Sequence, residues 1–206
     1  SLSLSLSLKK GSQSEVMPIN VVLDTDLGDD IDDTWALALA LRCPELCLRL
    51  VLTAGHGFHN LRAKMAAKIL RAAGAEGVII GLGCVATEPR KAFMYQKAWA
   101  EGVDLSQWEA TSGGKVENDG VGQLIELVMS SDEPTTIIAI GPMDNIAEAL
   151  HREPRIAERA RFVSMLGSID VGYFGLPGPV AEFNVAMNPI AVRTVLCAPW
   201  LEKIIT

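Results

Sequence analysis

The sequence predicts an α/β fold: a Rossmann-like, mostly parallel sheet with helices on both faces. Short apolar runs alternate with longer amphipathic stretches along the chain, and strands that alternate with helices usually form a parallel sheet. The 206 residues suffice for one domain with a substantial core. Apolar residues make up 49% of the chain and charged residues 21%, which is the usual balance of a globular protein.

In the first half of the chain, short apolar runs predict strands and longer stretches with helical spacing predict helices. The run 19–23 predicts a buried strand, and the stretch 35–41 predicts the helix that follows it. A second strand is predicted at 48–52 and a third at 78–80, with a helix at 61–73 between them. Each strand–helix–strand step predicts a parallel pair.

The predicted helix at 61–73 has two distinct faces. Its apolar residues share one face, which we expect to contact the core: Leu61, Met65, Ile69 and Ala72. Its basic residues are expected to form a solvated face: Arg62, Lys64, Lys68 and Arg71.

The stretch 86–114 gives a weak signal, and we expect an irregular or partly helical insertion there. Its aromatic residues lie among glycines and polar residues. Tyr95, Trp99 and Trp108 are expected to pack in the core or to anchor a flap, and stacking on an aromatic ligand is the alternative.

The second half repeats the alternation of strands and helices. The turn at 118–120 and Asp144 are typical of residues that begin helices, and the Gly- and Pro-rich stretch 167–179 predicts a loop. Helices are predicted at 121–129, 145–150 and 188–197, and strands at 135–140, 162–166 and 203–206.

Composition excludes several classes of function. The net charge of -7 argues against nucleic acid as the main partner, because phosphate binding needs a basic face. No apolar run reaches the length that spans a bilayer. The four cysteines form no zinc-binding pattern, and buried free thiols predict a reducing, cytoplasmic location. Residues 1–17 open on a Ser-Leu repeat and are expected to be a disordered low-complexity leader before one domain at 18–206.

An aspartate cluster follows the first predicted strand. Six of the ten residues from 24 to 33 are aspartates, and they lie on a strand-to-helix turn, where open α/β sheets bind ligands. Asp24 and Asp26 alternate at the end of the strand, so helix capping does not explain them. A set of oxygen ligands with this charge favours Ca²⁺ or Mg²⁺. The cluster therefore predicts a metal or catalytic site.

Two other interpretations of the cluster are open at this point. Asp32 and Asp33 are typical of a helix N-terminus, where carboxylates accept hydrogen bonds from free N–H groups. The run 21–26 also looks like the start of a haloacid-dehalogenase-like Mg²⁺ phosphatase, with Asp24 as the nucleophile. Such phosphatases need a second Asp-Asp pair late in the chain, and this sequence has none.

Several segments together resemble the inosine–uridine nucleoside hydrolase family. The segment 24–37 resembles the family's DTDxGxDDxxAL signature, 140–147 is similar to its G-P-L-T-N-I-A segment, and 179–184 is similar to its P-x-A-E-F-N segment. Residues 153–156 look like its E-P-R-I segment. The motifs occur in the family's order, and the resemblance runs from about residue 19 to residue 206.

The resemblance implies a Ca²⁺-dependent enzyme that hydrolyses the N-glycosidic bond of ribonucleosides to free base and ribose. It assigns Asp32 as the general base and Glu182 and Asn184 as residues that hold the ribose hydroxyls. The implied metal ligands are Asp24, Asp26, Asp33 and Asp144, and Asp144 contributes its main-chain carbonyl.

The sequence departs from the family pattern in ways that leave alternatives open. The loop has two extra residues between Gly28 and Asp32, so Asp30 is a second candidate for the base.

The family's ribose-binding Asn after the second strand has no clear match: by the preceding glycine it falls on Phe58, and Asn60 is a nearby substitute. His56 and His59 lie close by in the sequence; either is a candidate to bind substrate or protonate a leaving base, and polar loop histidines without a role are the alternative.

The chain also stops at residue 206, before the family's C-terminal His-Asp pair, so we expect a fold that is incomplete at the C-terminus. A catalytically inactive truncated relative is therefore the alternative to an active hydrolase. The expected partner is a ribonucleoside, with no nucleic acid or membrane, and a homo-oligomer is possible.

Overall fold

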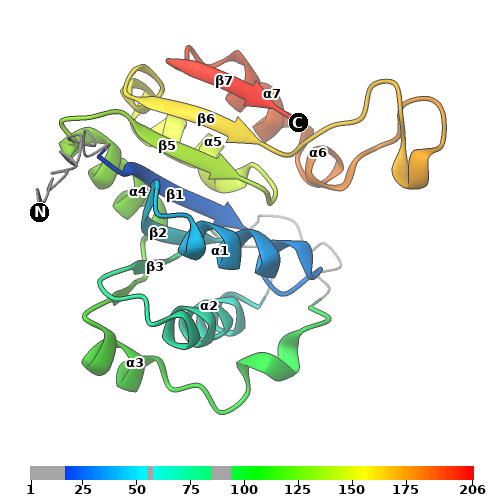
Figure 1. Ribbon diagram of the computed structural model, residues 1–206. Helices are drawn as coiled ribbons and strands as arrows, with labels where there is room; N and C mark the ends of the chain where they lie inside the picture. Colours follow the sequence, from blue (N-terminus) through cyan, green and yellow to red (C-terminus); the bar gives the residue numbers. More distant parts are fainter. Residues whose placement is uncertain (1–16, 55–57, 85–93) are drawn as a thin grey trace, which may run out of the picture.

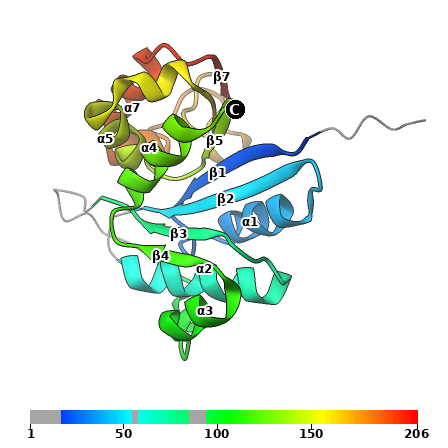
Figure 2. The same cartoon turned by 90° about the vertical axis from the view of Figure 1, so that its left-hand side faces the viewer.

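The computed structural model describes residues 17–54, 58–84 and 94–206. Its centre is a seven-stranded sheet with the strand order β4-β3-β2-β1-β5-β6-β7 (Figures 1 and 2). All six neighbouring pairs of strands are parallel, which confirms the predicted α/β class. The strands are β1 Ile19–Thr25, β2 Leu46–Thr53, β3 Ile79–Leu82, β4 Lys115–Glu117, β5 Thr135–Ala139, β6 Ala160–Ser164 and β7 Glu202–Ile205.

Seven α-helices and three short 3₁₀ turns connect the described strands. The α-helices are α1 Asp32–Arg42, α2 His59–Ala73, α3 Leu105–Ser112, α4 Gly120–Ser130, α5 Asp144–Arg152, α6 Phe183–Met187 and α7 Pro189–Cys197. The 3₁₀ turns are η1 Lys97–Ala100, η2 Pro154–Glu158 and η3 Tyr173–Gly175. The predicted strands and helices are all present in order; β4, α6 and the 3₁₀ turns are additional. The predicted leader lies, except for Met17, outside the described residues.

The sheet separates two apolar cores, because alternate residues of its strands point to opposite faces. On one face Val22 packs with residues of α4, α5 and α7, such as Leu124, Ile146 and Val195. On the other face Val21 belongs to the core that α1, α2 and α3 complete. Figure 2 shows these two helical layers on either side of the strands. The prediction of helices on both faces is confirmed.

The direction in which strands are added to the sheet reverses next to β1. The chain runs outward from β1 through β2 and β3 to β4, then returns to pair β5 against the other side of β1. In open parallel sheets such a reversal leaves a crevice outside the carboxyl ends of the two central strands, and ligands bind there. The aspartate cluster follows the carboxyl end of β1, so the topology places it at this crevice.

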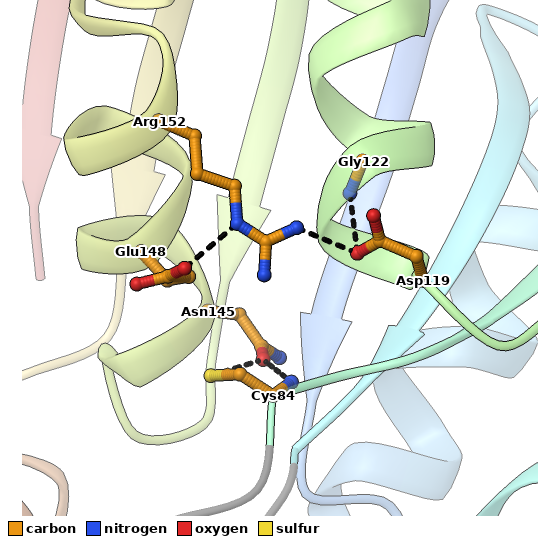
Figure 3. Close-up of polar contacts among 6 residues, drawn as sticks. All are labelled: Cys84, Asp119, Gly122, Asn145, Glu148 and Arg152. Carbon is orange, nitrogen blue, oxygen red and sulfur yellow. Dashed lines mark hydrogen bonds and ion pairs between the residues drawn. The ribbon is translucent and has the colours of Figure 1, made fainter.

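An ion-pair network joins α4 and α5 on the outer side of the first core (Figure 3). The Arg152 guanidinium lies 2.7 Å from Glu148 in its own helix and 2.8 Å from Asp119. Asp119 also accepts a hydrogen bond from the Gly122 N–H at 3.0 Å and so caps α4. That backbone hydrogen bond, followed by the contact with Arg152, lowers the pKa of Asp119.

The expected solvated face of α2 is wrong for one residue. Lys68 and Arg71 are exposed, but Arg62 is 0% exposed and forms an ion pair with Asp29. On the apolar side Met65 is buried as expected, whereas Ala72 is exposed. The cause is the position of the first turn of α2, which packs against the acidic turn after β1 and buries a side chain that the sequence pattern predicts to be in water.

No helix in the described ranges 17–54, 58–84 and 94–206 is long and apolar enough to cross a membrane.

The weakly patterned insertion contributes Trp108 of α3, which is fully buried in the core beside α2. We expect Trp108→Ala to lower the free energy of unfolding by about 3–5 kcal/mol, because it leaves a large cavity. Urea denaturation followed by circular dichroism measures this change. Trp99→Ala is the matched control, since Trp99 is 47% exposed. Equal effects of the two substitutions would contradict the assignment of Trp108 to the core.

Candidate active site

A cavity of about 390 Å³ opens at the carboxyl ends of β1, β5 and β6. One wall is formed by five aspartates of the turn after β1: Asp26, Asp29, Asp30, Asp32 and Asp33. The remaining walls comprise Ile140, Met165, Tyr95, Tyr173 and the start of α6, Glu182 to Asn184. Its volume lies within the range of small-molecule sites.

The turn that carries the aspartates is built by local backbone contacts. The Leu27 N–H donates to the Thr25 hydroxyl at 3.1 Å, and the Asp29 N–H donates to the Asp26 carbonyl at 3.2 Å. Gly28 has a φ of 104°, a conformation that side-chain-bearing residues rarely adopt. A Cβ at this position would also lie 2.7 Å from the Met94 Cε. The chain therefore reverses sharply and presents its carboxylates on both sides of one turn.

Asp26 and Asp33 are two of the buried carboxylates that line the cavity, each 5% exposed; Asp29 and Glu182 are the others. Burial raises the pKa of Asp33 well above its usual range, and the neighbouring charge of Asp26 raises it further. The Thr25 hydroxyl, which donates to Asp33, acts in the opposite direction. Two buried carboxylates that repel each other are stabilised by either a proton or a cation.

Gly141 follows β5 and packs against Asp26. A Cβ at Gly141 would lie 2.9 Å from the Asp26 nitrogen and 3.2 Å from its Oδ1. Real Cβ atoms almost never approach as closely as 2.9 Å. The β5–α5 connection therefore packs directly on Asp26, and only glycine allows this approach.

Asp24 lies behind the cavity wall in a buried polar network. Its Oδ1 accepts a hydrogen bond of 2.7 Å from the Asn145 Nδ2, which also donates to the Thr53 carbonyl at 3.2 Å. The Asn145 Oδ1 accepts from the Cys84 N–H at 2.9 Å, as Figure 3 shows. One asparagine of α5 thereby fastens the carboxyl ends of β1, β2 and β3 together. Burial raises the pKa of Asp24 to about 8, with the Asn145 hydrogen bond lowering it and the Asp26 charge raising it.

Glu182 and Asn184, which the resemblance assigns to the ribose hydroxyls, form a buried polar pair. The Glu182 carboxylate accepts hydrogen bonds from the Asn184 and Val185 N–H groups, at 2.8 and 3.1 Å, and so caps α6. It also accepts from the Gly167 N–H at 3.0 Å. The Asn184 Nδ2 donates to the carbonyls of Ile140 and Met165, which follow β5 and β6. The pair anchors the short helix α6, which was not predicted, to the end of the sheet.

Two tyrosine side chains also line the cavity. Tyr95 is 75% exposed and Tyr173 is 45% exposed. The Tyr173 hydroxyl accepts a hydrogen bond of 2.6 Å from the Phe183 N–H, which ties the loop before α6 to its first turn. Exposed ring faces beside a cavity suit a flat, apolar ligand group.

The structure brings together six of the predicted site residues in one cavity: Asp26, Asp30, Asp32, Asp33, Glu182 and Asn184. It places others elsewhere. Asn60 borders a separate depression with Lys64, and Asp24 is bonded to Asn145 in the network described above. Asp144, predicted to contribute its main-chain carbonyl, begins α5, and its carboxylate accepts a hydrogen bond from Asn188. His56 lies outside the described residues.

Sequence reasoning missed Asp29 and Arg62. Asp29 also lines the cavity, and its carboxylate lies 2.8 Å from the buried guanidinium of Arg62. A signal was available, since an extra aspartate in a crowded turn needs a nearby cation and a basic residue lies in the first turn of α2. The spacing does not reveal which of the four basic residues of α2 turns inward.

The donor set at the turn fits a hard divalent cation. Asp26 and Asp33 offer carboxylate oxygens at a buried, negatively charged position, which Ca²⁺ and Mg²⁺ prefer. The Asp24 Oδ2 has no hydrogen-bond partner among the described residues. In the same part of the chain, no three His, Cys, Asp or Glu side chains converge as a metal-binding group. The described carboxylates would thus supply only part of a coordination shell, and main-chain oxygens, water or substrate would have to complete it.

The sequence is similar to known hydrolases over most of its length. The family model described as "Inosine-uridine preferring nucleoside hydrolase" matches residues 21–206. The chain is 35% identical over 190 residues to the inosine-uridine preferring nucleoside hydrolase of Crithidia fasciculata, covering 89% of this chain and 58% of that protein. It is 33% identical over 182 residues to a non-specific ribonucleoside hydrolase of Salmonella agona, covering 86% and 57%.

The fold is also similar to solved structures. An inosine-uridine preferring nucleoside hydrolase from Bacillus anthracis superposes with a TM-score of 0.70 at 23% identity, covering 91% of this chain and 65% of that one. At this identity the similarity concerns the fold. The chain spans 58% and 57% of the lengths of the two curated relatives named above.

Asn145→Ala tests the network behind the cavity wall. The substitution removes the donor to the buried Asp24 and the acceptor for Cys84, and buried polar groups without partners cost about 1–3 kcal/mol. We expect the free energy of unfolding, measured with urea, to fall by about that amount. Asn60→Ala, at an exposed position of α2, is the control and should change little. An unchanged stability of Asn145→Ala would contradict the structural role of the network.

Proposed function

The chain belongs to the inosine-uridine preferring nucleoside hydrolase family, and on this premise we propose that it hydrolyses the N-glycosidic bond of ribonucleosides to free base and ribose. The observation that carries the proposal is the cavity at the carboxyl ends of β1, β5 and β6. Its acidic wall holds Asp26, Asp32 and Asp33, and Glu182 and Asn184 also line it.

The chemistry of the reaction suits this arrangement. Departure of a base leaves a ribosyl group with oxocarbenium character, which an anionic wall stabilises. The attacking water must lose a proton, and a carboxylate within reach of it acts as the general base. Asp32 is the proposed base by its match to the family motif, and Asp30 is the alternative. Both side chains line the cavity and belong to exposed residues.

Ca²⁺ is the proposed cofactor, with Asp26 and Asp33 as side-chain ligands and the Asp144 main-chain carbonyl as a further ligand by resemblance. When bound, the cation would supply a Lewis acid that lowers the pKa of a water molecule. The repulsion between the buried carboxylates of Asp26 and Asp33 supports this assignment. Asp24 lies behind the ligands, bonded to Asn145, and is proposed to support the metal site rather than to contact the substrate.

The remaining walls are proposed to bind the two halves of a nucleoside. Glu182 and Asn184, held rigidly by the backbone of α6 and by the carbonyls after β5 and β6, would orient the ribose hydroxyls. Tyr95 and Tyr173 would stack on the base. Asn60, as a nearby substitute for the family's ribose-binding Asn, and His56, from its place after the second strand in the sequence, stay candidate substrate-binding residues.

Two alternatives from the sequence have different outcomes. Family membership decides against the haloacid-dehalogenase-like phosphatase, because the matching model spans residues 21–206. A catalytically inactive relative stays an alternative that activity measurements distinguish. A cytoplasmic location and assembly into a homo-oligomer also stay predictions.

Release of ribose from a panel of purine and pyrimidine nucleosides, with Ca²⁺ and with a chelator, tests the proposal. We expect calcium-dependent turnover that falls about 10²–10⁴-fold in Asp32→Asn, the usual contribution of a general base. Asp30→Asn is the paired variant, and exposed Asp132→Asn is the control. A larger loss of turnover in Asp30→Asn than in Asp32→Asn would indicate that Asp30, and not Asp32, is the general base. Absence of turnover in the native chain would favour the inactive relative.

A further inference from the structure

We propose that Arg62 is a positioning residue, and that Arg62 and Gln96 together clamp the acidic turn 26–33 in the shape that presents Asp26 and Asp33 to the cavity. The proposal rests on the proposed function only where it concerns calcium. Its structural part stands on the contacts of the turn itself.

Arg62 reaches the turn from the first turn of α2 and is completely buried. Its Nη1 donates to the main-chain carbonyl of Asp26 and to that of Leu27, the latter at 3.0 Å. Its Nη2 lies 2.8 Å from the Asp29 carboxylate. One guanidinium therefore contacts three residues of a single turn.

These contacts require an arginine in this one position. A buried cation is costly unless its hydrogen-bond donors are matched and its charge is paired. The planar fork of the guanidinium can match several acceptors at fixed angles, which a lysine ammonium cannot do in the same way. The acceptors lie within reach of one guanidinium only when the turn has its observed conformation. Burial of Arg62 therefore favours that conformation over others.

Gln96 holds the same turn from the segment before η1. Its N–H donates to the Gly28 carbonyl at 3.1 Å, and its Nε2 donates to the Asp30 carbonyl at 2.5 Å. Its Oε1 accepts from the Thr34 hydroxyl of α1 at 2.9 Å. Together, Arg62 and the main-chain and side-chain N–H groups of Gln96 donate to the main-chain carbonyls of four residues between 26 and 30.

The clamp contacts the main chain and Asp29, whereas Asp26 and Asp33 line the cavity. This division of contacts gives a role to Asp29, which lies in the longer loop. Asp29 pairs with the clamp, whereas Asp26 and Asp33 repel each other at the place where a cation would bind. Arg62 thus acts through the turn and touches neither the water nor the nucleoside.

Amide hydrogen exchange of the metal-free chain tests the structural part. We compare the native chain with Arg62→Met, Arg62→Lys and Gln96→Ala, and Arg71→Met on the exposed side of α2 is the matched control. In the native chain the Leu27 and Asp29 amides are hydrogen-bonded within the turn. We expect faster exchange confined to residues 27–33 in all three variants, strongest in Arg62→Met, and none in Arg71→Met.

Calorimetric titration with Ca²⁺ tests the consequence for the metal. We expect the affinity to fall about 10–100-fold in Arg62→Met, the usual effect of losing a residue that orients a ligand, and to be unchanged in Arg71→Met. If circular dichroism shows that Arg62→Met does not fold, hydrogen exchange and calcium titration of Arg62→Lys and Gln96→Ala test the proposal instead.

The outcomes separate this proposal from the proposed function. Native exchange rates at 27–33 in the Arg62 and Gln96 variants would overturn the clamp, as would an equal acceleration over the whole sheet, which indicates general destabilisation. If the native chain binds no Ca²⁺, the metal assignment fails, and the clamp is then judged by the exchange data.

Discussion

Burial of negative charge at the end of β1 is the constraint on which the rest of the site depends. Asp24, Asp26, Asp29 and Asp33 are all nearly inaccessible to water, although they lie within ten residues of one another. Carboxylates in such a setting are stable only when each finds a hydrogen-bond donor, a cation or a proton. The structure meets this requirement differently for each of them, and these differences separate supporting residues from reactive ones.

Asp24 accepts a hydrogen bond from Asn145, and Asp29 pairs with Arg62. Both partners come from helices that follow other strands, so the parallel order of the sheet is what assembles the site. The Asp33 carboxylate accepts a hydrogen bond from the Thr25 hydroxyl, but burial and the charge of Asp26 still raise the pKa of Asp33. The pair of Asp26 and Asp33 is therefore the part of the cluster that remains under electrostatic stress, and a divalent cation would relieve it.

Much of this arrangement could be predicted from the sequence, for identifiable reasons. The apolar runs predicted the order of strands and helices, because the spacing of apolar residues and the length of each run distinguish strands from helices when the two alternate along the chain. The acidic turn and the Glu182–Asn184 pair were predicted to be functional, and both line the observed cavity.

Other features depend on tertiary contacts that local pattern does not encode. Arg62 looks solvent-exposed by helical spacing, yet the packing of α2 on the acidic turn buries it. Strand β4 and helix α6 are short, and α6 is held by a capping carboxylate and by side-chain contacts to distant carbonyls rather than by an apolar stripe. Asn60 was chosen by sequence proximity, but it lies in a different depression.

Proton release on calcium binding tests the central claim most directly. Calorimetric titrations at mildly acidic pH, in two buffers of different ionisation enthalpy, give the number of protons that leave the protein when the metal binds. Because the pKa of Asp33 is raised, the account predicts that Ca²⁺ displaces a proton, and that this release is lost in Asp33→Asn but kept in the exposed Asp132→Asn. Binding without proton release, or equal release in both variants, would contradict the claim that the stressed pair of Asp26 and Asp33 holds the metal.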